Sequence, residues 1–249
     1  MATTLAELLA VRDRAAAFSG WSFDHAGVTH PEGREPWDYA AVAASHVRHA
    51  GAVLDLGTGG GERFGEVLES AGFSGRAYAT EQWHVNAPVA RERLRPLAVP
   101  VVRADSLRLP FRGGSFELVL SRHEAIEPAE VDRVLRPGGT FLTQQVFESW
   151  QELRPFFPRQ TVHPAHEDGY RDWFAGAGYG VRQERHHYGA VFESLGELVF
   201  NLLVAPWEIP GLDVEGDFEA LRAVERALGS AGRIRLSEAR YLLWARKPG

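Results

Sequence analysis

The sequence contains no cysteine and a single lysine, Lys247, and both shortages narrow the chemistry that it can carry. Without cysteine there is no disulfide, thiolate zinc site, iron–sulfur cluster or cysteine nucleophile. One lysine near the C-terminus disfavours a Walker-type phosphate site and Schiff-base catalysis. No apolar run approaches the roughly 20 residues that span a bilayer, and no signal peptide is visible at the N-terminus. We therefore expect a cytoplasmic protein with no membrane partner.

The charge balance is mildly acidic. The 249 residues include 27 basic and 33 acidic side chains, a net charge of −6, and 45% of the residues are hydrophobic. This composition is ordinary for a globular protein, and the length suits one large α/β domain or one domain with appended helices. The acidic balance argues against a broad nucleic-acid surface, so a nucleic-acid partner is disfavoured.

Short apolar runs alternate with helical patterns in the middle of the chain. The run "AVLDL" is followed by "GERFGEVLESAG", and the alternation continues through "RAYATE", "VPVVRAD", "FELVLS" and "TFLTQQV". Strands that alternate with helices at this spacing form a parallel sheet with helices on both faces. We therefore predict an α/β fold whose core occupies residues 50–147.

The flanking segments are interpreted as additions to a single domain of residues 1–249. Residues 1–49 carry two helical patterns, the first opened by a capping box in "TTLAEL". Residues 148–249 form a substrate-side half, with a helical insertion at about 190–232 and a final strand in "ARYLLWARK". No internal repeat or low-complexity linker divides the chain.

The turn after the first of these strands holds four glycines in "GTGGGE" and follows Asp55. Glycine lets a turn adopt positive φ and lets a ligand approach the backbone closely. Ligands of open parallel sheets bind beyond the carboxyl ends of the strands. A dinucleotide site would place a glycine where Glu62 stands, and this glutamate would repel a pyrophosphate. Asp55 instead indicates a cationic ligand group, and a dinucleotide oxidoreductase is disfavoured.

Two further carboxylates end the next two strands. Glu81 ends the second strand, where a carboxylate can accept both hydroxyls of a ribose. Asp105 ends the third strand, where it can accept the exocyclic amine of an adenine. Together with Asp55, these positions predict a nucleoside ligand with a cationic group.

Four motifs in this order resemble the class I S-adenosylmethionine-dependent methyltransferases. They are "VLDLGTGGG", "YATEQW", "RADSLRLPF" and "VDRVLRPGGTFLTQQV", and the resemblance covers about residues 50–147 well and the rest loosely. It implies a doubly wound, Rossmann-like sheet of seven strands with the last antiparallel, and a helical cap. It also implies the cofactor S-adenosyl-L-methionine, with S-adenosyl-L-homocysteine as product. The cofactor-binding residues that it implies are Asp55, Gly57, Thr58, Gly59, Gly61, Glu81, Gln82, Trp83, Asp105, Ser106, Leu107 and Ser121.

The triplet Arg122, His123 and Glu124 follows the fourth strand, beside the expected position of the sulfonium methyl group. A bacterial subgroup of the family is similar in having an Arg-His-Glu triplet here. We predict catalytic roles for all three, with His123 as proton acceptor or orienting group, because imidazole suits proton transfer near neutral pH. An ion pair between Arg122 and Glu124 that only shapes the loop is the competing interpretation.

The same subgroup has a Gln-Gln pair after the fifth strand and a later Pro-Trp-x-x-Pro. Gln144, Gln145 and Trp207 match these features and are predicted to bind the methyl acceptor. The apolar segment that contains Trp207 is open to two interpretations, a packed core or a lid. Trp83 is likewise either an adenine contact or a surface aromatic. No metal is expected, since "HEAIE" does not match the zinc motif H-E-x-x-H.

The sequence therefore predicts a methyltransferase that acts on a nitrogen or oxygen of a small molecule in specialised metabolism. The expected mechanism is in-line displacement in a site that aligns the nucleophile and excludes water. RNA methylation is a second hypothesis, and a cofactor-binding partner subunit without catalysis is a third. A monomer or a homodimer is expected.

Overall fold

The computed structural model describes residues 2–18, 27–161 and 166–249. These residues form two compact units. Unit 1 comprises Met1–Glu35, Phe147–Pro164 and His187–Ala239, and unit 2 comprises Pro36–Val146, Ala165–His186 and Arg240–Gly249. In the described part of the chain, no helix combines the length and the apolar character that crossing a membrane requires.

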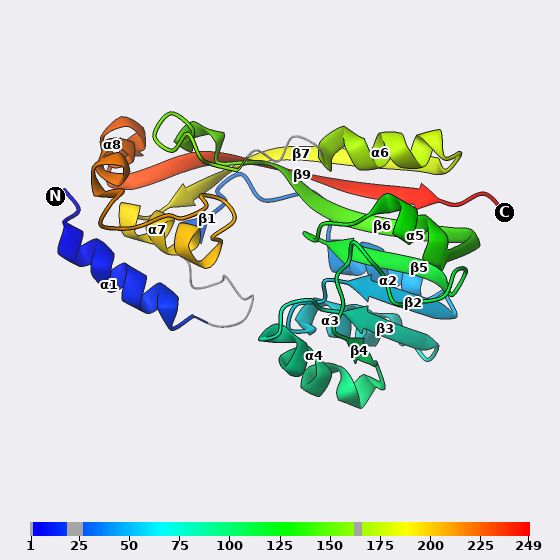
Figure 1. The fold of residues 1–249 in the computed structure, drawn as a ribbon. Coiled ribbons are helices and arrows are strands. Elements are labelled where there is room, and N and C mark those ends of the chain that lie inside the picture. Colours follow the sequence, from blue (N-terminus) through cyan, green and yellow to red (C-terminus); the bar gives the residue numbers. More distant parts are fainter. Residues whose placement is uncertain (1, 19–26, 162–165) are drawn as a thin grey trace. The chain divides into compact units, whose positions relative to one another are not determined.

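Unit 2 is built on a mixed sheet in the order β7-β9-β6-β5-β2-β3-β4 (Figure 1). The five strands from β2 to β6 run parallel to one another. β9 runs antiparallel to β6, as two backbone hydrogen bonds show: Gly138 N donates to Pro248 O, and Lys247 N donates to Gly139 O. The bounds are β2 Ala52–Leu56, β3 Arg76–Thr80, β4 Val101–Val102, β5 Phe116–Arg122, β6 Leu135–Ser149, β7 Gly180–Phe192 and β9 Arg233–Arg246.

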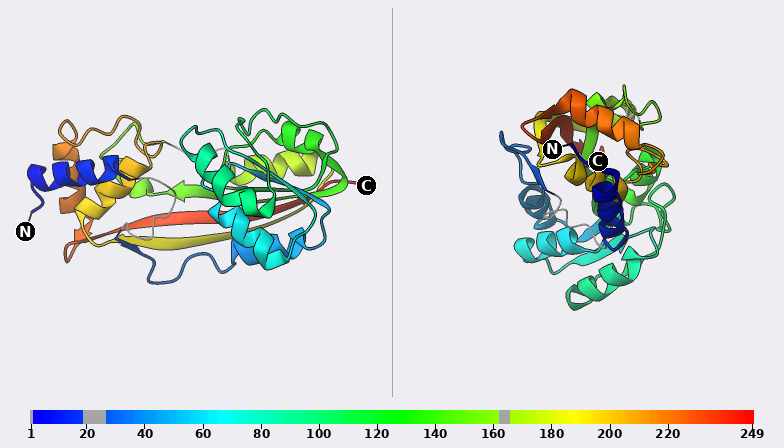
Figure 2. Two further views of the ribbon diagram at one scale, coloured as in Figure 1. Left: turned by 90° about the horizontal axis from the view of Figure 1, so that it is seen from below. Right: turned by 90° about the vertical axis from the view of Figure 1, so that its left-hand side faces the viewer.

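Helices cover both faces of this sheet, with α2 and α3 on one face and α5 and α6 on the other (Figure 2). The core on the first side joins α2, α3 and α4 to the middle strands. Phe141 of β6 and Phe174 of α6 meet on the second side, with ring centroids 5.3 Å apart. The bounds are α2 Tyr39–Val47, α3 Glu62–Ala71, α4 Asn86–Leu94, the 3₁₀ turn η1 Arg95–Leu97, α5 Pro128–Val134 and α6 His166–Gly176.

The single lysine ties the end of β9 to α5. The Nζ atom of Lys247 donates to the backbone oxygens of Asp132 and Leu135 at 2.6 and 3.1 Å. It also lies 2.9 Å from the Asp132 carboxylate. An ammonium has three N–H donors, so this set of partners engages all of them.

Unit 1 has its own apolar core, in which α1 and α7 lie side by side (Figures 1 and 2). The predicted capping box opens α1: Glu7 N donates to Thr4 Oγ1, and Thr4 N donates to the Glu7 carboxylate. The elements of this unit, besides the ends of β6, β7 and β9, are α1 Leu5–Ala16, β1 Val28–Thr29, η2 Gln151–Leu153, α7 Leu195–Val204, α8 Phe218–Leu228 and β8 Gly229–Ser230.

The predicted fold class is confirmed, while details of three elements were not predicted. The second helix begins at Tyr39, after Pro36, because the carboxylate of Asp38 caps it by accepting from Ala40 N and Ala41 N. The last strand begins at Arg233 rather than Ala239, because β8 turns back into it as a hairpin. The two-residue strand β1, which pairs with β7, was not predicted.

Candidate functional site

The glycine turn leaves β2 with three residues in the left-handed region. Gly57, Gly59 and Gly61 have φ of 61°, 62° and 83°, values that disfavour any residue with a Cβ. A Cβ on Gly61 would also lie 2.9 Å from Cγ of Leu94, so the start of α3 packs closely on α4. Thr58 N is bound to Thr80 O at 2.9 Å, which joins the turn to β3. The turn is therefore held in place at the edge of the sheet, and its glycines present backbone rather than side chains.

Asp55 is a buried residue of β2, two positions before the first glycine of this turn. It is paired in register with Ala79 of β3 and Leu120 of β5, so strands flank it on both sides. The pKa of Asp55 is raised to about 7, chiefly by burial; a hydrogen bond with Thr58 and the charge of Arg122 oppose the rise, and the carboxylates of Glu124 and Glu81 contribute to it. A cationic ligand would favour the ionised carboxylate.

Glu81 follows β3 and holds the turn from the other side. Its Oε2 accepts from Gly59 N at 2.7 Å, and its Oε1 accepts from Trp83 N at 2.8 Å. Burial raises the pKa of this side chain despite the two backbone hydrogen bonds. Each carboxylate oxygen can accept a second hydrogen bond, so Glu81 can both shape the turn and bind a pair of hydroxyls.

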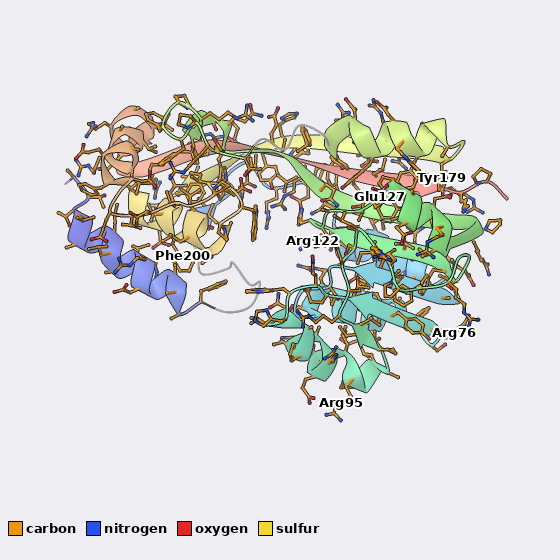
Figure 3. The ribbon with its side chains drawn as sticks, viewed as in Figure 1. Arg76, Arg95, Arg122, Glu127, Tyr179 and Phe200 are labelled. Carbon is orange, nitrogen blue, oxygen red and sulfur yellow. The ribbon has the colours of Figure 1, made fainter. Side chains whose placement is uncertain are left out.

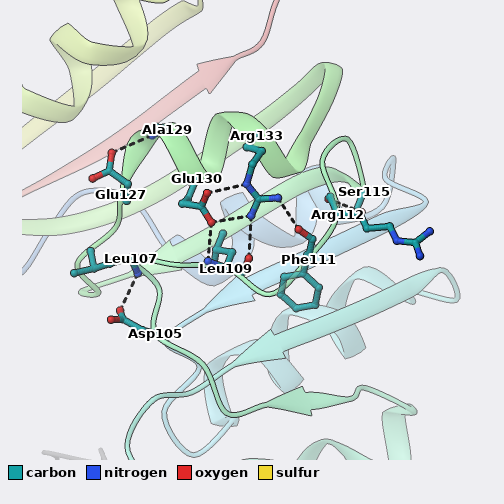
Figure 4. Close-up of polar contacts among 10 residues, drawn as sticks. All are labelled: Asp105, Leu107, Leu109, Phe111, Arg112, Ser115, Glu127, Ala129, Glu130 and Arg133. Atoms are coloured by element: carbon teal, nitrogen blue, oxygen red, sulfur yellow. Dashed lines mark hydrogen bonds and ion pairs between the residues drawn. The ribbon is translucent and has the colours of Figure 1, made fainter.

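Asp105 follows β4, and its Oδ1 accepts from Leu107 N at 2.8 Å. The loop that continues from it is held by α5 (Figure 4). Arg133 donates to Leu109 O and Phe111 O, while Glu130 accepts from Leu109 N. Arg133 and Glu130 also form a bidentate pair, with both N–O distances 2.7 Å.

Sequence reasoning missed this pair, although its signal is visible. Glu130 and Arg133 stand three residues apart in "EVDR" on α5, which is the spacing of a helical ion pair. Such pairs usually lie on the solvated face of a helix. Here the guanidinium instead binds two backbone carbonyls of the loop that carries the predicted adenine contacts.

The triplet after the fourth strand lies at the carboxyl end of β5, where Figure 3 labels Arg122. Arg122 is the last residue of the strand, and the chain turns sharply at His123, whose φ is 59°. A left-handed conformation costs a non-glycine residue roughly 1–2 kcal/mol, and such strain is typical of functional sites. His123 N donates to Gln144 O at 2.9 Å, which helps to hold the turn.

Glu124 points back toward the glycine turn. A Cβ on Gly57 would lie 2.5 Å from Oε2 of Glu124, so the carboxylate lies directly against this glycine. Burial raises the pKa of Glu124 to about 7, the carboxylates of Glu81 and Asp105 add to the rise, and hydrogen bonding from Ser106 opposes it. Asp55, Glu81 and Glu124 are thus three acidic side chains, from the ends of three strands, that adjoin the glycine turn.

The glutamine pair is buried within β6, where Gln144 is paired in register with Arg122 at the end of β5. Gln145 donates from Nε2 to Glu124 O at 2.8 Å and to Thr143 Oγ1 at 2.9 Å. Gln144 accepts from Nε1 of Trp37 at 2.8 Å, and its Nε2 lies 3.2 Å from Nε2 of His123. The structure therefore brings both glutamines to the triplet, together with Trp37, which sequence reasoning did not single out.

The remaining predicted site residues fall into two groups. Ser106 and Ser121 are buried, and Leu107, Gln82 and Trp83 are exposed around the same strand ends. Trp207 belongs to unit 1, where its backbone oxygen accepts a hydrogen bond from Thr161 and its side chain is exposed. Its role in acceptor binding stays a prediction.

Residues 54–143 match the family model described as a methyltransferase domain. The parallel core, the glycine turn and the acidic strand ends lie within this matched segment. The chain therefore contains a class I S-adenosylmethionine-dependent methyltransferase domain.

Relatives of this methyltransferase include ubiquinone/menaquinone biosynthesis C-methyltransferases. The protein of Cupriavidus metallidurans is 28% identical over 130 residues, which cover 49% of this chain and 54% of the relative. That of Nitrosospira multiformis is 29% identical over 130 residues, 49% of this chain and 53% of the relative. The match thus spans about half the length of these relatives.

Similar solved structures share the methyltransferase fold. A putative methyltransferase from Bacillus halodurans has a TM-score of 0.62 at 20% identity, covering 85% of this chain and 99% of its own. The [4+2]-cyclase SpnF has a TM-score of 0.57 at 17% identity, covering 98% and 94%. A Haemonchus contortus N-methyltransferase, in complex with phosphomonomethylethanolamine and S-adenosylhomocysteine, has a TM-score of 0.55 at 15% identity, covering 86% and 53%.

The residues of this methyltransferase fit the cofactor of the family. S-adenosylmethionine carries two positively charged groups, a sulfonium and an ammonium. Three acidic side chains adjoin the glycine turn, and none of the hydrogen bonds described above joins them to a lysine or an arginine. Among the described residues, no hydrogen-bond partner reaches the buried hydroxyl of Ser121 at the end of β5. A glycine-rich turn, carboxylates of raised pKa and an unsatisfied hydroxyl are consistent with a polar, cationic ligand at this edge of the sheet.

Proposed function

We propose that the protein transfers a methyl group from S-adenosylmethionine to a nitrogen or oxygen of a small molecule of specialised metabolism. The observation that supports this most directly is the group of acidic side chains at the glycine turn. Burial raises the pKa of Asp55 and Glu124 to about 7. A sulfonium or ammonium beside them would stabilise their ionised forms.

The roles follow from the positions of these residues. S-adenosylmethionine supplies an electrophilic methyl group when bound. Asp55 accepts from the ammonium, Glu81 from the ribose hydroxyls and Asp105 from the adenine amine. The turn from Gly57 to Gly61 lets the backbone approach the ligand closely.

The acceptor side is formed by the polar end of β5 and β6. We assign catalytic roles to Arg122, His123 and Glu124, and acceptor binding to Gln144, Gln145 and Trp207. Buried amides fix the direction of hydrogen bonds to a small polar substrate more firmly than exposed side chains do. This set of groups supports a heteroatom acceptor over a purely apolar one.

Methylation at carbon is the rival reaction, since the relatives in Cupriavidus metallidurans and Nitrosospira multiformis are named C-methyltransferases. The two reactions differ in the product. We suggest incubating the protein with methyl-labelled S-adenosylmethionine and three acceptor classes, namely amines, phenols and quinols. Mass spectrometry of the product then locates the methyl group. Methylation at ring carbon alone would contradict the proposal.

RNA methylation and a non-catalytic role are distinguished from this function by simple measurements. An RNA methyltransferase should bind RNA with an affinity that falls steeply as salt is raised. A non-catalytic partner subunit should bind the cofactor without forming S-adenosylhomocysteine with any acceptor class. Neither outcome is expected for a small-molecule enzyme with a net charge of −6.

Glu81 offers the direct test of the cofactor site. Hydrogen bonds to a charged group contribute about 1.5–3 kcal/mol each, and tenfold in affinity is about 1.4 kcal/mol. Glu81→Ala should therefore weaken S-adenosylmethionine binding at least tenfold in calorimetry. Glu92→Ala is the matched control, because Glu92 lies on α4 and pairs only with exposed Arg95 among the ion pairs described. Equal affinities of the two variants would remove Glu81 from the site.

A further inference from the structure

Three side chains from distant parts of unit 2 form a chain of hydrogen bonds. Trp37 precedes α2, Gln144 lies in β6 and His123 follows β5. Nε1 of Trp37 is 2.8 Å from Oε1 of Gln144, and Nε2 of Gln144 is 3.2 Å from Nε2 of His123. The Gln144 side chain is fully buried, so water does not replace either neighbour.

The donor and acceptor roles in these two hydrogen bonds follow from Trp37. An indole N–H can only donate, so the atom of Gln144 that faces Trp37 must be the amide oxygen. The amide nitrogen then faces His123, and an amide NH₂ can only donate. Nε2 of His123 must therefore accept, which places the imidazole proton on Nδ1.

The backbone of residue 123 is held by the same partner. Gln144 is paired in register with Arg122, and its carbonyl oxygen accepts from His123 N at 2.9 Å. The left-handed conformation of His123, with φ of 59°, carries its side chain out of the line of the strand. Gln144 thus fixes both the main chain and one ring nitrogen of this residue.

We propose that Trp37 and Gln144 are positioning residues that hold His123 as the neutral Nδ1–H tautomer. His123 then acts as a hydrogen-bond donor to the methyl acceptor and does not take its proton. The donor role rests on the proposed function, and the tautomer does not. The acceptor class that fits is one whose nucleophile arrives unprotonated and keeps a second lone pair for the Nδ1–H group, such as a carboxylate or a phenolate.

The tautomer can be measured without cofactor or acceptor. The full chain is labelled with ¹⁵N-histidine, and long-range ¹H–¹⁵N spectra are recorded near neutral pH. The resonances of His123 are assigned by their absence in His123→Asn. We expect a protonated Nδ1 and an unprotonated Nε2. A protonated Nε2 in the unaltered protein would overturn the proposal, and this arm does not depend on any variant that folds poorly.

Two substitutions test the chain of bonds. In Gln144→Glu both oxygens accept, so Nε2 of His123 should become protonated. Trp37→Phe removes the indole donor that directs the Gln144 amide, so the share of the Nδ1–H tautomer should fall and the Nε2–H tautomer should appear. Trp244→Phe is the matched control, because Trp244 contacts Arg182 and lies outside the three-residue chain. Unchanged His123 signals in both test variants, with folding verified by circular dichroism, would refute the positioning roles.

Cofactor binding separates this proposal from the proposed function. Calorimetry with S-adenosylmethionine should give nearly the same affinity for Trp37→Phe as for the unaltered protein. Failure of the unaltered protein to bind the cofactor would defeat the proposed function and leave the tautomer assignment standing. An Nε2–H tautomer with normal cofactor binding would do the reverse.

Discussion

Replacing Asp55 with asparagine should stabilise the protein without cofactor, and by an amount that depends on pH. The pKa of Asp55 lies at about 7 in the fold, against an ordinary value of 3.8, chiefly because the carboxylate is buried. Each tenfold change in an ionisation equilibrium corresponds to about 1.4 kcal/mol. Ionising Asp55 at pH 8 therefore costs the folded state on the order of 4 kcal/mol relative to the unfolded chain.

The sign follows from proton counting. Between about pH 4 and pH 7 the folded protein holds the Asp55 proton more tightly than the unfolded chain does. The contribution of this residue to the free energy of unfolding therefore falls as the pH rises through that window, and it stays low above it. Asparagine has nearly the same shape and no proton to lose, so Asp55→Asn removes this dependence.

Urea unfolding, followed by circular dichroism at pH 4.5 and pH 8 without cofactor, measures the effect. We expect Asp55→Asn to exceed the unaltered protein by only about 1 kcal/mol at pH 4.5, close to the ordinary pKa of the carboxyl group, and by up to about 4 kcal/mol at pH 8. Asp132→Asn is the control with the opposite sign. Hydrogen bonds from Tyr179 and Lys247 lower the pKa of Asp132, so this substitution should destabilise the protein at pH 8. A less stable Asp55→Asn at pH 8 would refute the reasoning.

Three further outcomes are expected. The affinity for S-adenosylmethionine should fall by at least about tenfold per pH unit below pH 7 in the unaltered protein and less steeply in Asp55→Asn, where Glu124 still titrates, as calorimetry at several pH values can show. Arg133→Ala should weaken cofactor binding and increase hydrogen exchange at residues 109–111, whose carbonyls it holds; equal exchange rates would contradict this. Gly61→Ala should lower the free energy of unfolding by on the order of 2 kcal/mol, more than Gly72→Ala, because both have positive φ but only Gly61 adjoins Leu94. Equal losses would show that backbone strain alone decides.

Much of the fold could be predicted because its signals are local. The buried strand Ala52–Leu56 is followed by the glycine turn and then by an amphipathic helix. Parallel strands place their carboxyl ends at one edge of the sheet, so the alternation alone predicts that Asp55 and Glu81 lie at the same edge. The capping box of α1 likewise depends only on residues three apart.

The missed features depend on contacts between distant residues. Trp37 and Gln144 are 107 positions apart, and no periodicity relates them. The position of Glu124 against Gly57 depends on the left-handed turn at His123, and the sequence of the triplet does not predict this turn. Arg133 is typical of an exposed helical residue in sequence, and only the path of the 109–111 loop makes it a backbone ligand.

The saturated ammonium of Lys247 has a practical consequence for labelling. Amine-reactive dyes, cross-linkers and acylating agents attack the free base, and this amine must leave two carbonyls and a carboxylate before it can lose a proton and react. Its side chain is 21% exposed, and the sequence offers no other lysine. The folded protein should therefore resist amine coupling at side chains. Modified Lys247 in a peptide map would indicate that the end of β9 has separated from α5.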